Sequence, residues 1–170
     1  MGEFEKALQK YGKYVVQQAR TRLTKGRQPY GTINSSKQLY NSLKFNVKKN
    51  GIVFNMLEYG EYQDQGVRGK NSYYADETAN SPFKYKNKIP PAQPFEKWIK
   101  KKGIQGRDKK TGRFITRKSL SFIIARSIYS KGIRATLFFT KPFEDGLNKY
   151  SDEFIEGFLN DNLNIEEWVH

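Results

Sequence analysis

The chain has no cysteine, and its one histidine, His170, is the last residue. The absence of cysteine excludes disulfides, Cys-ligated zinc or iron–sulfur centres and thiol catalysis. Without an internal histidine, histidine-based triads and general acid–base catalysis by histidine are excluded too. No apolar run approaches the about 20 residues of a membrane span, and the N-terminus is too acidic and polar for a signal peptide. We expect a protein made in the cytosol, with no catalytic residue, metal, cofactor or membrane partner.

Positive charge is in large excess, with 31 Lys and Arg against 17 Asp and Glu, a formal net charge of +14. Aromatic residues make up 15% of the chain, which favours a folded core over a disordered basic tail. The length predicts a single domain, residues 1–170. The charge is uneven: residues 1–60 carry +8, residues 61–120 carry +9 and residues 121–170 carry −3. A polyanion partner, head-to-tail contacts between copies, or a solvated loop would each fit.

Both ends of the chain have the periodicity of amphipathic helices. Apolar residues recur at three- and four-residue steps from Phe4 to Leu23, and this helix should end near Thr24, before Gly26. Near the C-terminus, the run 140–142 (TKP) is typical of a capping hydroxyl followed by a first-turn proline. The final helix should continue to about residue 160. We predict that it buries one stripe: Leu147, Tyr150, Phe154, Ile155 and Phe158.

The segments between these helices indicate a small sheet and shorter helices. Alternating apolar residues on either side of Asn50-Gly51 predict a hairpin over 43–57. A short helix is expected at 95–102 with Phe95, Trp98 and Ile99 buried, and a longer one at 119–132, capped by Ser119. The latter should bury a face made of Leu120, Ile123, Ile124, Ser127 and Ile128. The apolar run 135–139 is predicted to be a strand. Together these elements predict an α+β domain, with an antiparallel sheet of about four strands packed with two long amphipathic helices.

The middle of the sequence, about 67–118, is an irregular and basic insertion. A long segment without periodicity, at 66–93, is often a functional arm. Its tyrosines Tyr73, Tyr74 and Tyr85 predict a partner-binding arm that becomes ordered against a neighbouring protein. The basic residues that follow are candidates to face DNA or a partner: Lys100, Lys101, Lys102, Arg107, Lys109, Lys110 and Arg113.

The sequence offers few candidates for an active site. Glu58, Glu61 and Asp64 lie within one heptad, but the Glu-x-Lys spacing of a metal-dependent nuclease is absent. The glycine pairs in 66–69 (GVRG) and 103–106 (GIQG) lack the Lys-Ser/Thr of a phosphate-binding loop. We interpret both as ordinary turns and expect no catalysis.

The segment 59–66 (YGEYQDQG) resembles the central signature of the tail-completion and neck proteins of tailed bacteriophages. The order of the elements over residues 4–158 is similar to that family as well: an amphipathic helix, a hairpin, the tyrosine signature, a basic insertion, a helix, an apolar strand and a Phe-rich final helix. The residues that correspond to the family pattern are expected to pack or to form subunit interfaces: Tyr59, Gly60, Tyr62, Gly66 and Phe143.

The resemblance implies an α+β subunit without catalytic residues, located in the virion. Such subunits form a homo-oligomeric ring at the head–tail (neck) junction, or complete the tail end. The implied partners are portal or adaptor proteins, tail proteins, and genomic DNA that passes without being read. A second hypothesis is a DNA-binding protein or nuclease of a phage or mobile element that uses residues 97–118. A third is a toxin or inhibitor whose basic face binds an acidic partner.

Overall fold

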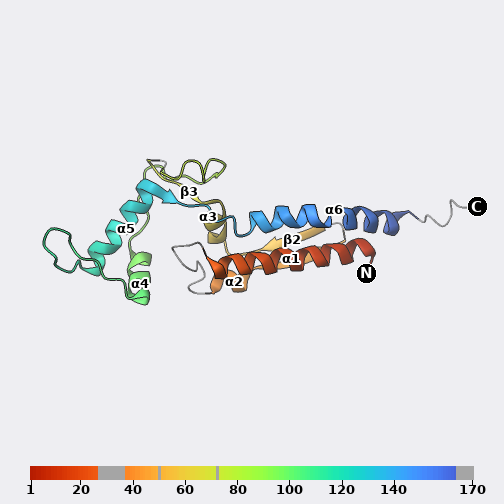
Figure 1. The fold of residues 1–170 in the computed structure, drawn as a ribbon, viewed down its shortest axis with the longest axis horizontal. Coiled ribbons are helices and arrows are strands. Elements are labelled where there is room, and N and C mark those ends of the chain that lie inside the picture. The colour runs from red at the N-terminus through yellow and green to blue at the C-terminus, as the bar shows by residue number, and fades with distance from the viewer. Residues whose placement is uncertain (27–36, 50, 72, 164–170) are drawn as a thin grey trace, which may run out of the picture. The chain divides into compact units, whose positions relative to one another are not determined.

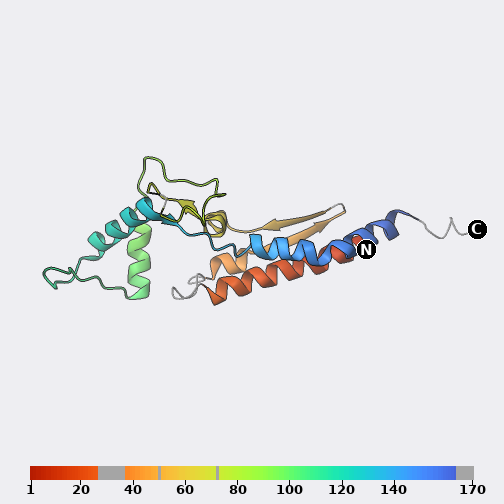
Figure 2. The same ribbon diagram turned by 45° about the horizontal axis from the view of Figure 1, so that its top comes forward.

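The computed structural model describes residues 1–26, 37–49, 51–71 and 73–163. The chain divides into two compact units. We call Met1–Asp64 with Thr136–His170 the helical unit, and Gln65–Ala135 the basic unit. Figure 1 shows both units along the chain, and Figure 2 shows them turned by 45°.

Within the described residues, the helical unit contains two long helices, two short ones and a hairpin. Its elements are α1 (Glu3–Lys25), α2 (Gln38–Ser42), β1 (Lys44–Lys48), β2 (Gly51–Asn55), α3 (Tyr59–Gln65) and α6 (Thr140–Asn162). The basic unit contains β3 (Val67–Arg68), α4 (Gln93–Lys102), α5 (Arg117–Lys131) and β4 (Gly132–Ile133). No helix in the described ranges has both the length and the apolar composition needed to cross a membrane.

Helix α1 forms where its apolar periodicity predicts. Ala7, Leu8, Tyr11, Val15, Ala19 and Leu23 are all buried on one face. The helix ends at Gly26, which adopts a positive φ of 63° and donates its N–H to the carbonyl of Arg22 at 3.0 Å. A residue without Cβ adopts this conformation at little cost.

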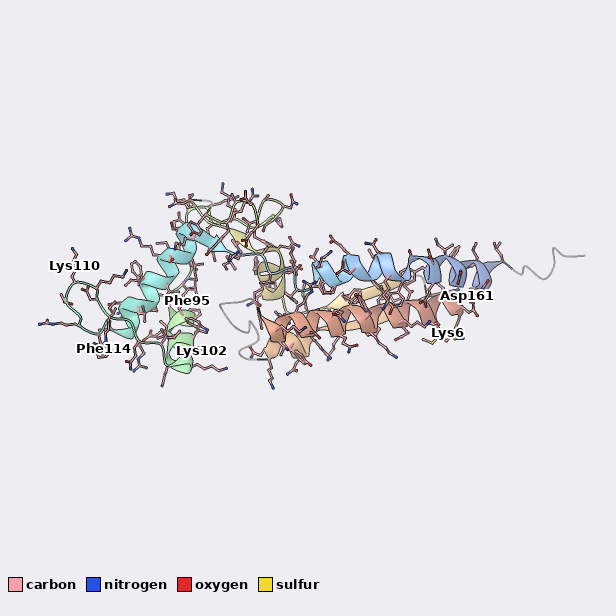
Figure 3. All side chains as sticks on the ribbon, in the orientation of Figure 1. Lys6, Phe95, Lys102, Lys110, Phe114 and Asp161 are labelled. Atoms are coloured by element: carbon pink, nitrogen blue, oxygen red, sulfur yellow. The ribbon has the colours of Figure 1, made fainter. Side chains whose placement is uncertain are left out.

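Helices α1 and α6 pack side by side in opposite directions (Figures 1 and 3). Near the end of α6, the Asp161 carboxylate accepts the N–H groups of Glu3 at 2.8 Å and Phe4 at 2.9 Å. These N–H groups lie in the first turn of α1, where they have no partner within the helix. Gly157 allows this close approach, since a Cβ there would lie 2.7 Å from the backbone nitrogen of Phe4.

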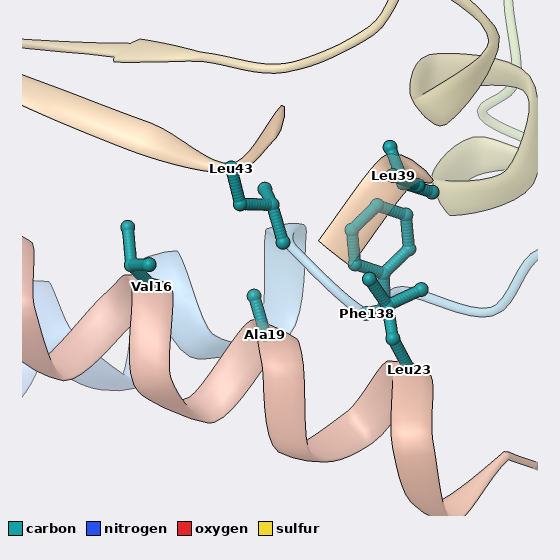
Figure 4. Packing of buried hydrophobic residues seen from close by; sticks show 6 residues of the cluster. All are labelled: Val16, Ala19, Leu23, Leu39, Leu43 and Phe138. Atoms are coloured by element: carbon teal, nitrogen blue, oxygen red, sulfur yellow. The ribbon is translucent and has the colours of Figure 1, made fainter. Parts of the chain in front are cut away.

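The hydrophobic core lies between α1, α2 and the segment that leads into α6. Figure 4 shows its buried residues: Val16, Ala19, Leu23, Leu39, Leu43 and Phe138. Towards α6, the ring of Tyr11 is 1% exposed and meets the rings of Phe54 and Phe154 edge-on at 5.8 and 5.5 Å. Its hydroxyl donates to the carbonyl of Phe143 at 3.2 Å, so a large polar ring is buried without leaving its hydroxyl unpaired.

The predicted hairpin is confirmed. Strands β1 and β2 pair antiparallel, with Phe45 opposite Phe54 and Val47 opposite Ile52. The prediction of one sheet of about four strands is wrong, because β3 and β4 form a separate two-stranded sheet. The apolar run 135–139 contributes no strand of its own. Its backbone bonds to the end of α3 instead: Leu137, at a positive φ of 49°, donates its N–H to the carbonyl of Asp64 at 2.9 Å.

The buried stripe of α6 differs from the predicted one. Leu147, Ile155 and Phe158 are 41%, 60% and 53% exposed. Pro142, Gly146 and Gly157 are buried, while Tyr150 and Phe154 are partly buried. Gly146 and Gly157 lie on the face of α6 that packs closely against α1. Because glycine has no apolar side chain, an analysis of hydrophobic periodicity does not identify this face.

Helices α4 and α5 also correct parts of the prediction. Thr116 rather than Ser119 caps α5, because the Thr116 hydroxyl accepts the N–H of Ser119 at 3.2 Å. The expected face of α5 is only partly buried: Ile123 is 50% exposed and Ser127 is exposed, whereas Ser121 and Ala125 are buried. In α4, Ile99 is fully buried as predicted and Gly103 ends the helix, but Trp98 is 41% exposed.

Candidate functional site

The net charge of the protein lies in the basic unit. Eighteen of the 31 Lys and Arg residues and four of the 17 Asp and Glu residues fall within Gln65–Ala135, which gives this unit a net charge of +14. The helical unit contains thirteen residues of each sign and is neutral. All seven basic residues singled out from the sequence belong to the basic unit, and all are exposed. They lie in the last turn of α4 and in the loop that leads to α5.

The first group of these basic residues lies in the last turn of α4. Lys100, Lys101 and Lys102 are consecutive, so they fan around the last turn of the helix at about 100° intervals. Positive charge at a helix C-terminus is stabilised by the helix dipole. Gly103 then stops the helix in the left-handed conformation, with φ 64°. The local fold thus favours a compact cationic cluster at this point, near which Figure 3 labels Lys102.

The second group sits on a tight loop between Arg107 and Phe114. These two residues pair across the loop in an antiparallel bridge, and the guanidinium of Arg107 lies 4.2 Å from the ring centre of Phe114. At the tip, the Asp108 carboxylate accepts the N–H groups of Thr111 and Lys110, both at 2.8 Å. These two backbone hydrogen bonds hold the pKa of Asp108 below its usual range. The loop therefore presents Lys109, Lys110 and Arg113 on a defined turn; Figure 3 labels Lys110 and Phe114.

The start of α5 adds positive charge where a helix usually has negative charge. Arg117 and Lys118 occupy its first turn, which contains no acidic residue. The positive end of the helix dipole makes these two cations locally unfavourable. Both are exposed. Their position suits an anionic partner better than it suits the stability of the isolated helix.

An open groove of about 580 Å³ lies between α4, the loop and the start of α5. Ile99, Ile104, Ile115 and Leu120 give it an apolar lining, and Lys100 and Arg117 are among its polar lining residues. Phe114, 60% exposed, lines it as well. The groove combines apolar contact area with positive charge, which are the features that bind an amphipathic acidic segment.

The predicted partner arm is folded back on its own unit. Tyr85 donates its N–H to the carbonyl of Arg68 at 2.9 Å, and its ring centre lies 6.2 Å from that of Tyr129. Burial raises the pKa of Tyr85. Tyr73 is 66% exposed and meets Tyr74 edge-on at 5.0 Å. Of the three tyrosines, Tyr73 is thus the one the structure leaves most accessible to a partner.

Sequence reasoning missed the buried polar groups that hold this arm. Thr78 is 1% exposed, and its hydroxyl donates to the carbonyl of Tyr74 at 2.7 Å. Ser81 is 4% exposed, and its hydroxyl donates to the carbonyl of Gly66 at 2.7 Å. Threonine and serine are common in loops of every kind. No pattern in the sequence marks these two as buried anchors.

The glycine pair of 66–69 is not the ordinary turn we predicted. Gly132 pairs with Arg68 where β3 pairs with β4, and Gly69 is the residue after β3. A Cβ on Gly69 would lie 2.3 Å from the nitrogen of Gly132. Gly66 and Gly132 both have positive φ, 72° and 92°. These glycines allow close backbone contacts within the basic unit.

The signature residues of the helical unit have separate structural roles. Gly60 is buried, and a Cβ there would lie 2.8 Å from the Leu39 side chain. Phe143 packs its ring 5.9 Å from that of Phe54, as part of the aromatic core. Tyr59 and Tyr62 are each 38% exposed at the surface of α3. Within the helical unit, these two tyrosines are thus the members of the sequence signature whose side chains are exposed at the surface.

Asp64, the most buried of the three carboxylates considered for a metal site, is a helix cap. It is 2% exposed and accepts the N–H of Phe139 at 2.7 Å, the N–H of Thr140 at 3.2 Å and the hydroxyl of Thr140. Glu58 and Glu61 are exposed. Over the described ranges, no group of three or more His, Asp or Glu side chains is arranged to hold a metal ion.

No protein-family model, curated protein or solved structure matches the chain.

Proposed function

We propose that the chain is a structural subunit of a tailed bacteriophage particle, which forms or completes an oligomeric ring at the head–tail junction or the tail end. The observation that carries the proposal is the uneven distribution of charge, with a net charge of +14 on the basic unit and a net charge of zero on the helical unit. A subunit beside the DNA channel meets a dense row of phosphates. Contacts to phosphates position DNA without reading its sequence, as a passing genome requires.

Exposed apolar side chains on both units support a role in assembly. Ile155 and Phe158 on α6 are more than half exposed, as are Phe114 and Phe122 in the basic unit. Soluble monomers rarely leave large contiguous apolar patches uncovered, and such patches mark contacts with other proteins. The resemblance of residues 59–66 to the neck and tail-completion signature supports the same role. Portal or adaptor proteins and tail proteins are the further partners in this proposal.

The test of this role is a phage in which a stop codon interrupts the gene for the chain. We expect electron microscopy of the lysate to show heads and tails that are not joined, or tails with an unfinished end. Supplying the intact chain from a plasmid should restore complete particles. Complete and infectious particles without the chain would contradict the proposal.

The DNA-facing role of the basic unit has a separate test. We expect replacement of Lys101, Lys102, Lys109 and Lys110 by serine to reduce retention of packaged DNA, measured as DNase-accessible genome in purified particles. The matched control replaces four exposed lysines of the helical unit by serine: Lys13, Lys44, Lys48 and Lys49. Both variants lose the same charge, so equal DNA retention in the two would contradict a role for the basic unit.

A second candidate function is a DNA-binding protein or nuclease, favoured by the same concentration of charge in the basic unit. Titration with duplex DNA at two salt concentrations separates the two functions. Binding to Z phosphates gives a log–log salt slope of about −0.9Z. Tight binding with a steep slope, or cleavage in the presence of Mg²⁺, supports the second function; weak binding together with ring formation supports the first.

A further inference from the structure

The outer face of α6 combines apolar and acidic side chains. Ile155 and Leu159 are 60% and 39% exposed, and Leu163, one residue after the helix, is 53% exposed. These three residues recur every four positions, so Ile155 and Leu159 lie on one side of the helix. Asp152 and Glu156 are exposed beside them. This stripe, which we call the outer stripe of α6, lies away from Gly146 and Gly157, the glycines that are buried.

The groove of the basic unit has the complementary character. Its lining is apolar at Ile104, Ile115 and Leu120, and positive at Lys100 and Arg117. An amphipathic helix binds such a groove by inserting its apolar side chains while its charges meet those of the rim. The acidic flank of the outer stripe and the basic lining of the groove are opposite in sign, which selects this pairing over basic or neutral helices.

We infer that the groove between α4 and α5 of one copy receives the outer stripe of α6 from a second copy. The contact is heterologous, because it joins two different surfaces of the same chain, and contacts of this kind build rings when the rotation closes. The inference deepens the proposed function and rests on it, since a ring subunit needs two complementary faces. It also divides the basic residues: Lys100 and Arg117 contact the neighbouring copy, while Lys109 and Lys110 at the loop tip stay available to DNA.

Because the chain has no cysteine, introduced thiols test the contact directly. Ile155→Cys and Gln105→Cys, a groove residue that is exposed, are combined in one chain and treated with a short bis-maleimide crosslinker. The experiment is carried out on the concentrated purified chain and on assembled particles. We expect a ladder of crosslinked oligomers in at least one of them. The control, Ile155→Cys with Lys109→Cys, places the second thiol at the loop tip and should give no ladder.

Charge reversal identifies the chemistry of the contact. Asp152→Lys with Glu156→Lys, and separately Lys100→Glu with Arg117→Glu, should each weaken self-association at least about tenfold, which is about 1.4 kcal/mol. Mixing the two variants should restore association between them, because the reversed stripe meets the reversed groove. Lys109→Glu with Lys110→Glu makes the same charge change outside the groove and should leave self-association unchanged. Circular dichroism of each variant shows that the fold is retained.

Three outcomes would overturn the inference: no ladder in either preparation, no restoration on mixing, or crosslinks from residue 105 to a different protein. The last outcome would assign the groove to that protein. These results are distinct from a failure of the proposed function. A chain that is dispensable for the particle can still self-associate through the stripe, and a chain required for head–tail joining can lack this crosslink.

Discussion

The carboxylate of Asp64 accepts the backbone N–H of Phe139 at 2.7 Å, across 75 residues of sequence. It also accepts the N–H and the hydroxyl of Thr140. Asp64 is the last residue of the first segment of the helical unit, and Phe139 precedes the first turn of α6. A side chain near the end of α3 therefore accepts the free N–H groups at the start of the final helix. The Thr140 hydroxyl, which we predicted to be the cap, instead donates to the same side chain.

Removing this cap should destabilise the helical unit. Asp64→Ala leaves the partly buried N–H groups of Phe139 and Thr140 without their acceptor. Loss of a cap costs about 0.5–2 kcal/mol, and a buried unsatisfied group costs about 1–3 kcal/mol. We expect a total loss of about 2–4 kcal/mol in the free energy of unfolding, measured by urea denaturation. Asp64→Asn keeps one acceptor oxygen and should lose less.

The matched control for the cap is Glu61→Ala. Glu61 lies on the same helix, α3, and is exposed. Surface substitutions of this kind change stability by about 0.5 kcal/mol or less. If Asp64→Ala unfolds at the same urea concentration as Glu61→Ala, the cap does not contribute to stability.

Asp161, near the end of α6, caps the first turn of α1 in a similar way. This cap predicts that the stability of the fold depends on pH. The N–H groups of Glu3 and then Phe4 are the main causes that hold the pKa of Asp161 below its usual value. A lowered folded-state pKa stabilises the fold above the ordinary aspartate pKa of about 3.9, and the contribution disappears as the pH falls through the folded-state pKa. The difference in Tm between the wild type and Asp161→Asn should therefore be largest at neutral pH and shrink in acid.

A control variant separates this effect from general acid unfolding. Glu156→Gln removes an exposed carboxylate from α6 without removing a cap. Its Tm should follow that of the wild type closely through the same acid range. A difference between the wild type and Asp161→Asn that stayed constant from neutral pH to about pH 2 would show that protonation of this carboxyl plays no part.

The close antiparallel pairing of β3 with β4 predicts that the basic unit tolerates no side chain at Gly69. A Cβ at this position would lie 2.3 Å from the nitrogen of Gly132 and from the carbonyl carbon of Lys131. Backbone atoms cannot move aside as a flexible side chain does, so Gly69→Ala should unfold or rearrange the β3–β4 pairing. We expect NMR spectra in which the amide signals of 65–135 shift or broaden while those of the helical unit persist. Gly51→Ala, with no atom within 4 Å of the new Cβ, should leave the spectrum almost unchanged.

Elements with a local periodicity could be predicted from the sequence. The prediction was wrong for a segment whose hydrogen-bond partners are distant in the sequence. The stripe of α1 and the hairpin follow from residues three, four or two positions apart, and both are confirmed. The run 135–139 has the composition of a strand, but Asp64 and the α3 backbone provide its hydrogen bonds. Tertiary contacts of this kind override local propensity, and no spacing in the sequence reports them.

The same difference explains the candidate site. The basic residues were visible in the sequence because charge needs no partner to be counted, and all seven lie in one unit. The groove was not visible, because it depends on the packing of α4 against α5 and on Gly103 turning the chain. Ile155 of the outer stripe was assigned to the core, because periodicity finds an apolar face but does not tell which neighbour covers it.

The buried hydroxyl of Ser81 is predicted to keep the partner arm (66–93) packed on the basic unit. It donates to the carbonyl of Gly66 at 2.7 Å and accepts the N–H of Phe83 at 3.2 Å. Ser81→Ala removes both bonds and should cost about 1–3 kcal/mol locally, because the buried carbonyl loses its donor. Limited digestion with chymotrypsin should then cleave earlier at Tyr73 and Tyr74, while the helical unit stays intact. Ser127→Ala changes an exposed serine of α5 and should leave the cleavage rate as in the wild type; equal rates in all three proteins would mean that Ser81 does not hold the arm.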